Sequence, residues 1–272
     1  MLPFKTVLRR LWAGSLAAAP LLFQAHVSIA SPSAADRVRI DDLVTASHVL
    51  ANEGVLDSYG HVSARSASNP QHFFMPRAMA PSEVSAADVV ELDMNCKPIH
   101  PDAPRLNGER FIHCEIYKAR PDVQSVIHAH DLAVIPFGLT RIPLRPVVAQ
   151  AGFLPPETPL FDARDAYGGT TPRGVEVRSP MLGRALAAKL GNNPVVLMAR
   201  HGETVVGPSV RVAAVRALYT NIDARAEWAA LAIGHDITPL DAEELRNNAA
   251  ENFDADRPWE NYQQRLLRGT GP

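Results

Sequence analysis

The 272-residue sequence has no excess of positive charge, since its 27 lysine and arginine residues are matched by 29 aspartate and glutamate residues. The formal charge of −2 argues against a nucleic-acid-binding protein, because neutralising phosphates requires a clear surplus of lysine and arginine. Internal repeats and low-complexity runs are also absent from the sequence. What is present is a chain with 46% hydrophobic residues, long enough for one packed domain.

Long hydrophobic runs are scarce, and one window that resembles a membrane span lies at the N-terminus. Residues 11–23 are apolar or small, but thirteen residues make only about 20 Å of helix, short of a bilayer core of about 30 Å. This run is followed by the small-residue pattern of a cleavage site and preceded by three basic residues, Lys5, Arg9 and Arg10. We therefore interpret residues 1–30 as an export signal cleaved near Ala30 rather than as a stable membrane anchor. A periplasmic or secreted protein is expected, by either the general or the twin-arginine route.

Cysteine is rare, which limits what disulfides could contribute. Cys96 and Cys114 are 18 positions apart and are the only two cysteines in the chain. Such a pair can form a disulfide in an oxidising compartment, but no framework of cysteine spacings requires it. The sequence-based expectation is that both are free thiols.

The spacing of apolar and turn-forming residues predicts helices that alternate with strands. The predicted helices cover residues 41–54, 108–120, 131–139, 181–190 and 209–233, and the predicted strands cover residues 61–65, 71–75, 89–92, 125–130, 195–199 and 203–206. Because tight turns join several strands, we expect a mixed, largely antiparallel sheet covered by helices. A doubly wound nucleotide-binding fold is disfavoured, since no G-x-G-x-x-G follows a strand and opens a helix.

The predicted elements define one domain with a segment on either side. The domain is expected to extend over residues 41–235. Residues 31–40 are interpreted as a frayed leader, and residues 236–272 as a polar C-terminal tail.

Three histidines and one glutamate are the strongest candidates for chemistry. His128 and His130 are two positions apart on a predicted strand, so their side chains point to the same face and can bind one cation. His201 follows an apolar strand at a tight turn, and Glu109 begins the helix that precedes the strand of His128. Three imidazoles with a carboxylate suit zinc, manganese, iron(II) or cobalt rather than calcium or magnesium. Each residue alone also has a purely structural explanation.

The chain resembles the class II aldolase and adducin family over residues 41–233. The matching motifs occur in family order: Tyr59-Gly60-His61-Val62-Ser63-Ala64-Arg65, Met75-Pro76-Arg77, Ala87-Asp88-Val89-Val90-Glu91-Leu92-Asp93, Glu109-x-x-x-His113-x-x-x-Tyr117, Arg120-Pro121-Asp122, Val126-Ile127-His128-Ala129-His130 and Arg200-His201-Gly202. The resemblance implies a three-layer α/β/α sandwich, usually assembled as a homotetramer. It also implies that His128, His130 and His201 bind a divalent metal, and that Glu109 is both a ligand and an acid/base.

The sequence departs from the family's sugar-phosphate aldolases where these bind phosphate. Positions that carry hydroxyl and amide groups in those enzymes hold His61, Arg77-Ala78 and Asn107-Gly108 here. Losing hydroxyls that would hydrogen-bond a buried phosphate disfavours a sugar-phosphate substrate. Arg77 and Arg65 are suited to a carboxylate, because a guanidinium group offers a bidentate fork. Either arginine can instead belong to a structural ion pair.

The pattern from Glu109 to His113 is most similar to the decarboxylase branch of the family. Members of that branch act on hydroxylated aromatic or pyridine carboxylates. His61, Arg65, Arg77 and His113 are therefore predicted to contact a small carboxylate substrate, although His113 also fits a buried, hydrogen-bonded histidine that orients Glu109.

Decarboxylation generates a carbanion, which a divalent cation can stabilise by polarising a neighbouring oxygen. Glu109 is the candidate for protonating the ring carbon afterwards, directly or through water. Three alternatives use the same residues differently: an aldolase or epimerase acting on a non-phosphorylated hydroxy acid or sugar, an iron(II) oxygenase, and a metal-free binding module like adducin.

Overall fold

Seven strands form one sheet at the centre of the structure, a computed structural model that describes residues 32–168, 174–234, 237–250 and 254–271. Their order across the sheet is β3-β2-β1-β4-β7-β6-β5. All neighbouring strands are antiparallel except β5 and β6, which are parallel. The strands are β1 (His61–Arg65), β2 (His72–Pro76), β3 (Val89–Asp93), β4 (Ser125–Ala129), β5 (Leu160–Phe161), β6 (Val195–Met198) and β7 (Gly202–Gly207).

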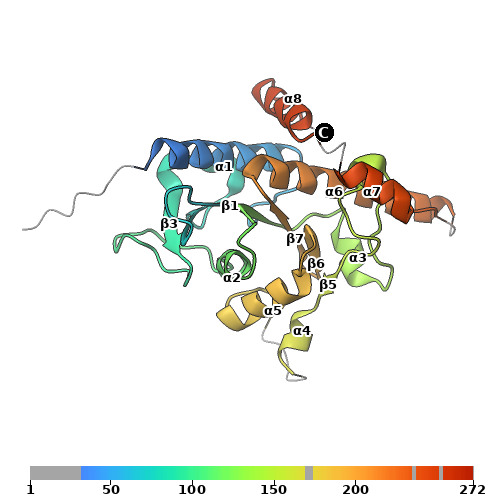
Figure 1. Cartoon of the computed structure of the whole chain (residues 1–272), viewed down its shortest axis with the longest axis horizontal. Coiled ribbons are helices and arrows are strands. Elements are labelled where there is room, and N and C mark those ends of the chain that lie inside the picture. Colours follow the sequence, from blue (N-terminus) through green and yellow to red (C-terminus); the bar gives the residue numbers. More distant parts are fainter. Residues whose placement is uncertain (1–31, 169–173, 235–236, 251–253, 272) are drawn as a thin grey trace, which may run out of the picture. The chain divides into compact units, whose positions relative to one another are not determined.

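Helices cover both faces of this sheet (Figure 1). One layer contains α1, α6 and α8, and the opposite layer contains α2 and α5. The α-helices are α1 (Ala34–Asn52), α2 (Phe111–Ala119), α3 (Ile135–Leu139), α4 (Ala163–Ala166), α5 (Pro180–Leu190), α6 (Val210–Ile233), α7 (Ala242–Ala250) and α8 (Asp256–Leu267), and the 3₁₀-helices are η1 (Pro81–Glu83), η2 (Ala86–Asp88) and η3 (Ala149–Ala151). The predicted α/β/α sandwich with a largely antiparallel sheet is confirmed.

Strand alternation divides the buried residues between two hydrophobic cores. On β4, Ile127 belongs to the core beneath α1 and α6, whereas Val126 belongs to the core beneath α2 and α5. His128 shares the face of Val126 because successive side chains point to opposite sides of a strand. His61 and Ser63 lie on that same face of β1, since Val62 packs in the α1 and α6 core. The polar residues of the central strands therefore gather on the α2 face.

The first described helix begins earlier than the sequence analysis predicted. Ser33 caps α1 by accepting a hydrogen bond from the backbone N–H of Asp36, so the helix starts at Ala34. The prediction of a frayed leader is thus wrong for residues 34–40. The predicted export signal, residues 1–30, lies outside the described residues. Among the described helices, none is both long and apolar enough to cross a membrane.

The C-terminal region is more ordered than a polar tail. It contains α7 and α8, and Trp259 of α8 is 1% exposed within the core that also holds α1 and α6. The low overall hydrophobicity of this segment hid the helix, because two buried aromatic residues, Trp259 and Tyr262, supply most of its apolar contact.

The two cysteines form a disulfide, so the prediction of free thiols is wrong. Cys96 lies in the turn after β3 and Cys114 lies on α2, with their Cα atoms 5.8 Å apart. Both side chains belong to the core beneath α2 and α5. Sequence spacing could not reveal the pairing, because packing of α2 against the β3 turn brings the two thiols together.

Candidate metal centre

Glu109, His128, His130 and His201 converge at one end of the central strands. One ligand atom from each residue lies within 4.8 Å of the others. His128 Nε2 is 3.2 Å from His130 Nε2, and Glu109 Oε2 is 3.6 Å from His128 Nε2 and 3.5 Å from His201 Nε2. The structure therefore brings together all four residues that the sequence analysis proposed as metal ligands.

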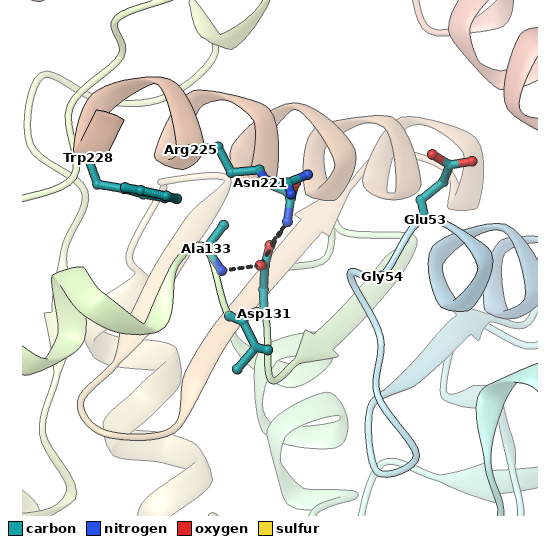
Figure 2. A pocket seen from close by; sticks show the side chains of 8 residues that line it. Glu53, Gly54, Asp131, Ala133, Asn221, Arg225 and Trp228 are labelled. Atoms are coloured by element: carbon teal, nitrogen blue, oxygen red, sulfur yellow. Dashed lines mark hydrogen bonds between the residues drawn. The ribbon is translucent and has the colours of Figure 1, made fainter. Parts of the chain in front are cut away.

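Strand β4 positions the two histidines that are closest in sequence. His128 is the fourth residue of β4, and His130 follows the last residue of the strand on the same face. The chain beyond His130 is fixed to α6, because Asp131 accepts hydrogen bonds from Asn221 Nδ2 at 2.8 and 2.9 Å and from Ala133 N at 2.8 Å (Figure 2). This anchor holds the strand end, and with it His130, against the long helix.

The turn between β6 and β7 places His201 beside β4. Gly202 has φ +153°, and a Cβ atom there would lie 2.0 Å from the carbonyl oxygen of Ala129, so only glycine fits. Arg200 has φ +62° and forms an ion pair with Asp162, with Nη2 2.8 Å from Oδ1. The Arg-His-Gly sequence therefore has a backbone role on either side of the ligand.

Glu109 lies in the turn just before α2 and reaches the histidines from the α2 layer. Its Oε1 accepts a hydrogen bond from the backbone N–H of Val177 at 2.7 Å, which leaves Oε2 toward His128 and His201. Burial alone would raise the pKa of Glu109, but the hydrogen bond with His201 and the charges of the neighbouring histidines hold it well below its usual range. The side chain is therefore a carboxylate, the form that binds metals.

Two of the three imidazoles are oriented by a contact on the ring nitrogen away from the centre. His128 Nδ1 is 2.9 Å from the carbonyl oxygen of Glu203, so it donates there and leaves Nε2 with a lone pair. His130 Nδ1 lies 3.1 and 3.2 Å from the carboxylate oxygens of Asp57. Burial also lowers the pKa of His128 to about 4, which favours the neutral ligand form. Sequence reasoning missed Asp57, although it precedes the Tyr59-Gly60-His61 motif by two residues.

The geometry of the four groups fits a small divalent cation. Tetrahedral ligand bonds of about 2.0–2.1 Å separate neighbouring ligand atoms by roughly 3.3 Å. The observed separations of 3.2, 3.5 and 3.6 Å are close to that value. Three nitrogens and one carboxylate oxygen suit zinc, manganese, iron(II) or cobalt, as the sequence analysis proposed.

A cavity of about 1120 Å³ opens beside these ligands. Glu109, His130 and His201 form part of its wall, together with polar side chains from two loops. Two arginines that the sequence analysis overlooked, Arg105 and Arg178, also line it. Arg178 lies against the backbone just before Glu109, since a Cβ added to Gly108 would be 3.3 Å from Arg178 Nη1. The only sequence signal for either arginine is its nearness to a recognised motif or loop.

The two arginines predicted to bind substrate have other partners. The buried Arg65 donates through Nε, Nη1 and Nη2 to the carbonyl oxygens of Val123, Pro70, Tyr117 and Arg120 at 2.8–3.1 Å. Arg77 Nε donates to Asp88 at 2.7 Å, and the cavity wall begins only with Ala78. Both predictions of substrate contact are wrong, because local carbonyl and carboxylate groups already take up these guanidinium groups.

His61 and His113 are buried behind the metal ligands rather than on the cavity wall. The ring of His61 lies between His128 and His113, with centroid separations of 5.2 and 4.7 Å. His113 is 0% exposed and contacts Ser63 and His61 instead of Glu109. Burial lowers the pKa of His113 to about 3, so it is neutral. The predicted direct substrate contact of His113 is therefore wrong, and the alternative of a buried, hydrogen-bonded histidine is correct, although it holds His61 and not Glu109.

Comparison with known proteins relates this geometry to enzymes. The family described as Class II Aldolase and Adducin N-terminal domain matches residues 41–228. Decarboxylase tropJ from Talaromyces stipitatus is 35% identical over 206 residues, which are 72% of this chain and 77% of that protein. A 3,4-dihydroxyphthalate decarboxylase from a Terrabacter species is 34% identical over 226 residues, covering 78% of this chain and 88% of the relative. The L-fuculose 1-phosphate aldolase from Glaciozyma antarctica has the same fold, with a TM-score of 0.71, 21% identity and coverage of 86% and 90%.

Proposed function

We propose, on the premise that the chain belongs to the class II aldolase and adducin family, that it is a metal-dependent decarboxylase of hydroxylated aromatic or heteroaromatic carboxylates. The observation that carries this proposal is the convergence of Glu109, His128, His130 and His201 beside a large cavity. The named activities of the two relatives support the decarboxylase branch over the aldolase branch.

Arg105 and Arg178 extend the proposal to an acidic group at the far side of the substrate. In the cavity wall these two arginines balance Glu109 and Glu176, so a bound divalent cation leaves two net positive charges there. Arg178 forms an exposed ion pair with Glu176 at 2.7 Å, which is weak enough for a carboxylate of the substrate to replace. A dianionic aromatic acid thus matches the charge of the site, with one carboxylate at the metal ligands and one at the arginines.

The cation supplies the electron sink, because it stabilises negative charge on a substrate oxygen next to the carbon–carbon bond that breaks. The protein must then hold the departing carboxylate and manage one proton. The protein's own groups fix the ligands: Val177 N, Asp57 and the carbonyl of Glu203 hold Glu109, His130 and His128 in place. Such fixed ligands reduce the reorganisation needed during the reaction.

Glu109 is ionised, so a proton that it delivers must first be acquired. We assign its source to the hydroxyl group ortho to the leaving carboxylate, which loses its proton to Glu109 as the substrate binds. Carbon dioxide then departs with its electron-pair deficit left on the carboxyl carbon, and the bonding pair stays on the ring. Glu109 returns the proton to that ring carbon, so the product is the phenolate with hydrogen in place of the carboxylate.

Metal analysis combined with a carbon dioxide release assay tests the proposal. Purified protein should contain close to one divalent ion per chain, lose activity on dialysis against a chelator, and regain it with zinc, manganese, iron(II) or cobalt. The assay should compare ortho-hydroxy aromatic mono- and dicarboxylates with non-phosphorylated hydroxy acids, and should monitor oxygen uptake. Full activity without metal refutes the proposal, whereas aldehyde release or oxygen consumption without carbon dioxide assigns the site to an aldolase or an oxygenase.

Export and assembly as a homotetramer stay predictions from the sequence. Fractionation of cells that express the full chain, with the N-terminus of the exported protein sequenced, tests cleavage near Ala30. Light scattering of the purified protein tests the tetramer.

A further inference from the structure

A chain of buried hydrogen bonds runs from α2 through β1 to the metal centre. Tyr117 Oη is 2.7 Å from Ser63 Oγ, and Ser63 Oγ is 2.6 Å from His113 Nδ1. His113 Nε2 is in turn 2.7 Å from His61 Nδ1. Tyr117, Ser63 and His113 are each no more than 1% exposed, and His61 is 4% exposed. Four side chains that are far apart in the sequence thus form one continuous chain shielded from solvent.

The direction of this chain follows from its first member. Among the described residues, Ser63 Oγ is the side-chain acceptor that the structure gives to the Tyr117 hydroxyl, so Tyr117 donates to Ser63. Ser63 then donates to His113 Nδ1, and neutral His113 carries its proton on Nε2 and donates to His61 Nδ1. In the reverse direction the Tyr117 hydroxyl would be buried without an acceptor, which is costly. His61 therefore keeps its own proton on Nε2.

The Nε2 atom of His61 has no hydrogen-bond partner among the described residues, although it is buried. It lies on the edge of the ring away from His113, and the same ring packs against His128 at a centroid separation of 5.2 Å. Because it bears a proton, Nε2 has no lone pair for a metal, which separates His61 from the four ligands. A buried donor without an acceptor at such a place indicates that its acceptor arrives with a ligand.

The position of His61 on β1 fits an acceptor held at the metal centre. His61 pairs with His128 across β1 and β4, so it stands at the strand end that carries the metal ligands. The residues just before it, Ser58 and Tyr59, line the cavity. An oxygen bound between the metal ligands and the His61 ring would complete the hydrogen-bonded chain.

We propose that Tyr117, Ser63 and His113 hold His61 in the Nε2–H tautomer, and that His61 donates this N–H to an anionic oxygen of the substrate. His61 is thus a substrate-binding residue set by three positioning residues. The identity of the oxygen rests on the proposed decarboxylase function, whereas the tautomer rests on the hydrogen-bonded chain alone.

Nitrogen NMR of the zinc-loaded full chain labelled with ¹⁵N-histidine tests the tautomer directly. The signals of His61 are identified by their loss in His61→Gln. The proposal expects a protonated Nε2 and an unprotonated Nδ1 at His61, and expects Tyr117→Phe to produce a mixture of the two tautomers, because it removes the donor that sets the direction. A proton on Nδ1 of His61 in the unmodified protein overturns the proposal.

Binding of salicylate, which has a carboxylate beside a hydroxyl group, tests the donor role. We expect His61→Leu to weaken salicylate binding about 10–100-fold with zinc content unchanged, because a hydrogen bond to a charged oxygen is lost. His61→Gln keeps an N–H near the same place and should stay within about threefold of the unmodified protein. His72→Leu, on neighbouring β2 and outside the cavity, is the matched control and should leave binding unchanged.

The two measurements separate this proposal from the decarboxylase proposal. Equal salicylate affinity in His61→Leu and the unmodified protein overturns the donor role, whatever reaction the enzyme catalyses. If His61→Leu does not fold, the tautomer measurement and a loss of binding in His61→Gln beyond tenfold decide against it in the same way. Failure of every aromatic acid to release carbon dioxide, with the tautomer and the salicylate result as expected, refutes only the decarboxylase function.

Discussion

The two ends of strand β1 bury basic side chains in opposite ways. At one end, every nitrogen of the Arg65 guanidinium group donates to backbone carbonyl oxygens. At the other end, His61 leaves Nε2 without a partner next to ligands whose nitrogen and oxygen atoms face one another across 3.2–3.6 Å. Buried polar groups in proteins are normally satisfied. A satisfied group therefore points to a structural role here, and a group left open points to a ligand.

The same contrast extends to the acidic side chains at each end of β1. Asp36 accepts hydrogen bonds from Ser66 Oγ at 2.9 Å and Ala67 N at 2.8 Å, and it also pairs with the Ser68 hydroxyl, so it ties α1 to the turn after β1. Glu109 uses only one oxygen in a hydrogen bond with the backbone and turns the other to the histidines. Four variants can break or sharpen this comparison.

The largest effect is expected for His128→Ala. The cation contributes several kcal/mol to stabilising the transition state, so losing a buried ligand should reduce kcat/KM by about a thousandfold or more. Metal content after gel filtration should fall with activity, while circular dichroism shows a folded protein. Retention of both metal and activity would remove His128 from the site and break the comparison at its open end.

Arg65→Met should affect stability and leave the chemistry intact. Removing the guanidinium group leaves several buried carbonyl oxygens without donors, at a cost of about 3 kcal/mol in the free energy of unfolding measured with urea. Arg77→Met, whose ion pair with Asp88 is partly exposed, is the control and should cost less than about 1 kcal/mol. KM for an aromatic acid should be unchanged in both variants. A tenfold rise in KM without loss of stability would return Arg65 to substrate binding.

Asp57→Asn tests whether contacts behind the ligands matter at the open end. The carboxylate of Asp57 orients His130 through Nδ1, and its loss should weaken metal affinity about 10–100-fold in a competition with a chromogenic chelator. Asp122→Asn, at an exposed ion pair with Arg120, offers the matched control. Equal affinity in the two variants would show that Asp57 does not support the ligand.

Acid should weaken the closed end through Asp36. Burial raises the pKa of Asp36, but hydrogen bonds from Ser68, Ser33 and Ala67 lower it to about 2, below its usual value of 3.8. Because the folded pKa is the lower one, the contribution of up to about 2 kcal/mol is present above pH 4 and is lost as pH falls toward 2. The stability difference between the unmodified protein and Asp36→Asn should therefore shrink from pH 5 to pH 3 in urea unfolding. A difference that is constant over this range would contradict the assigned contacts.

Much of the architecture could be predicted from local pattern. The strand at His61–Arg65 and the Ser209 cap of α6 were placed correctly, because alternation and capping chemistry act over a few residues. The C-terminal helix α8 was missed, since its burial depends on two aromatic residues in a polar segment that pack on helices from elsewhere in the chain. The disulfide was missed for the same reason.

The sequence by itself determined which chemistry the protein can offer. His128 and His130 had to share one face, because side chains alternate along a strand, and the Arg-His-Gly turn required glycine at 202. Only the tertiary structure decided which polar groups were left open. Arg65 and Arg178 are both arginines near recognised motifs, yet one is enclosed by carbonyl oxygens and the other lines the cavity. Hydrogen-bond satisfaction depends on neighbours that folding brings from distant segments, so no local pattern can encode it.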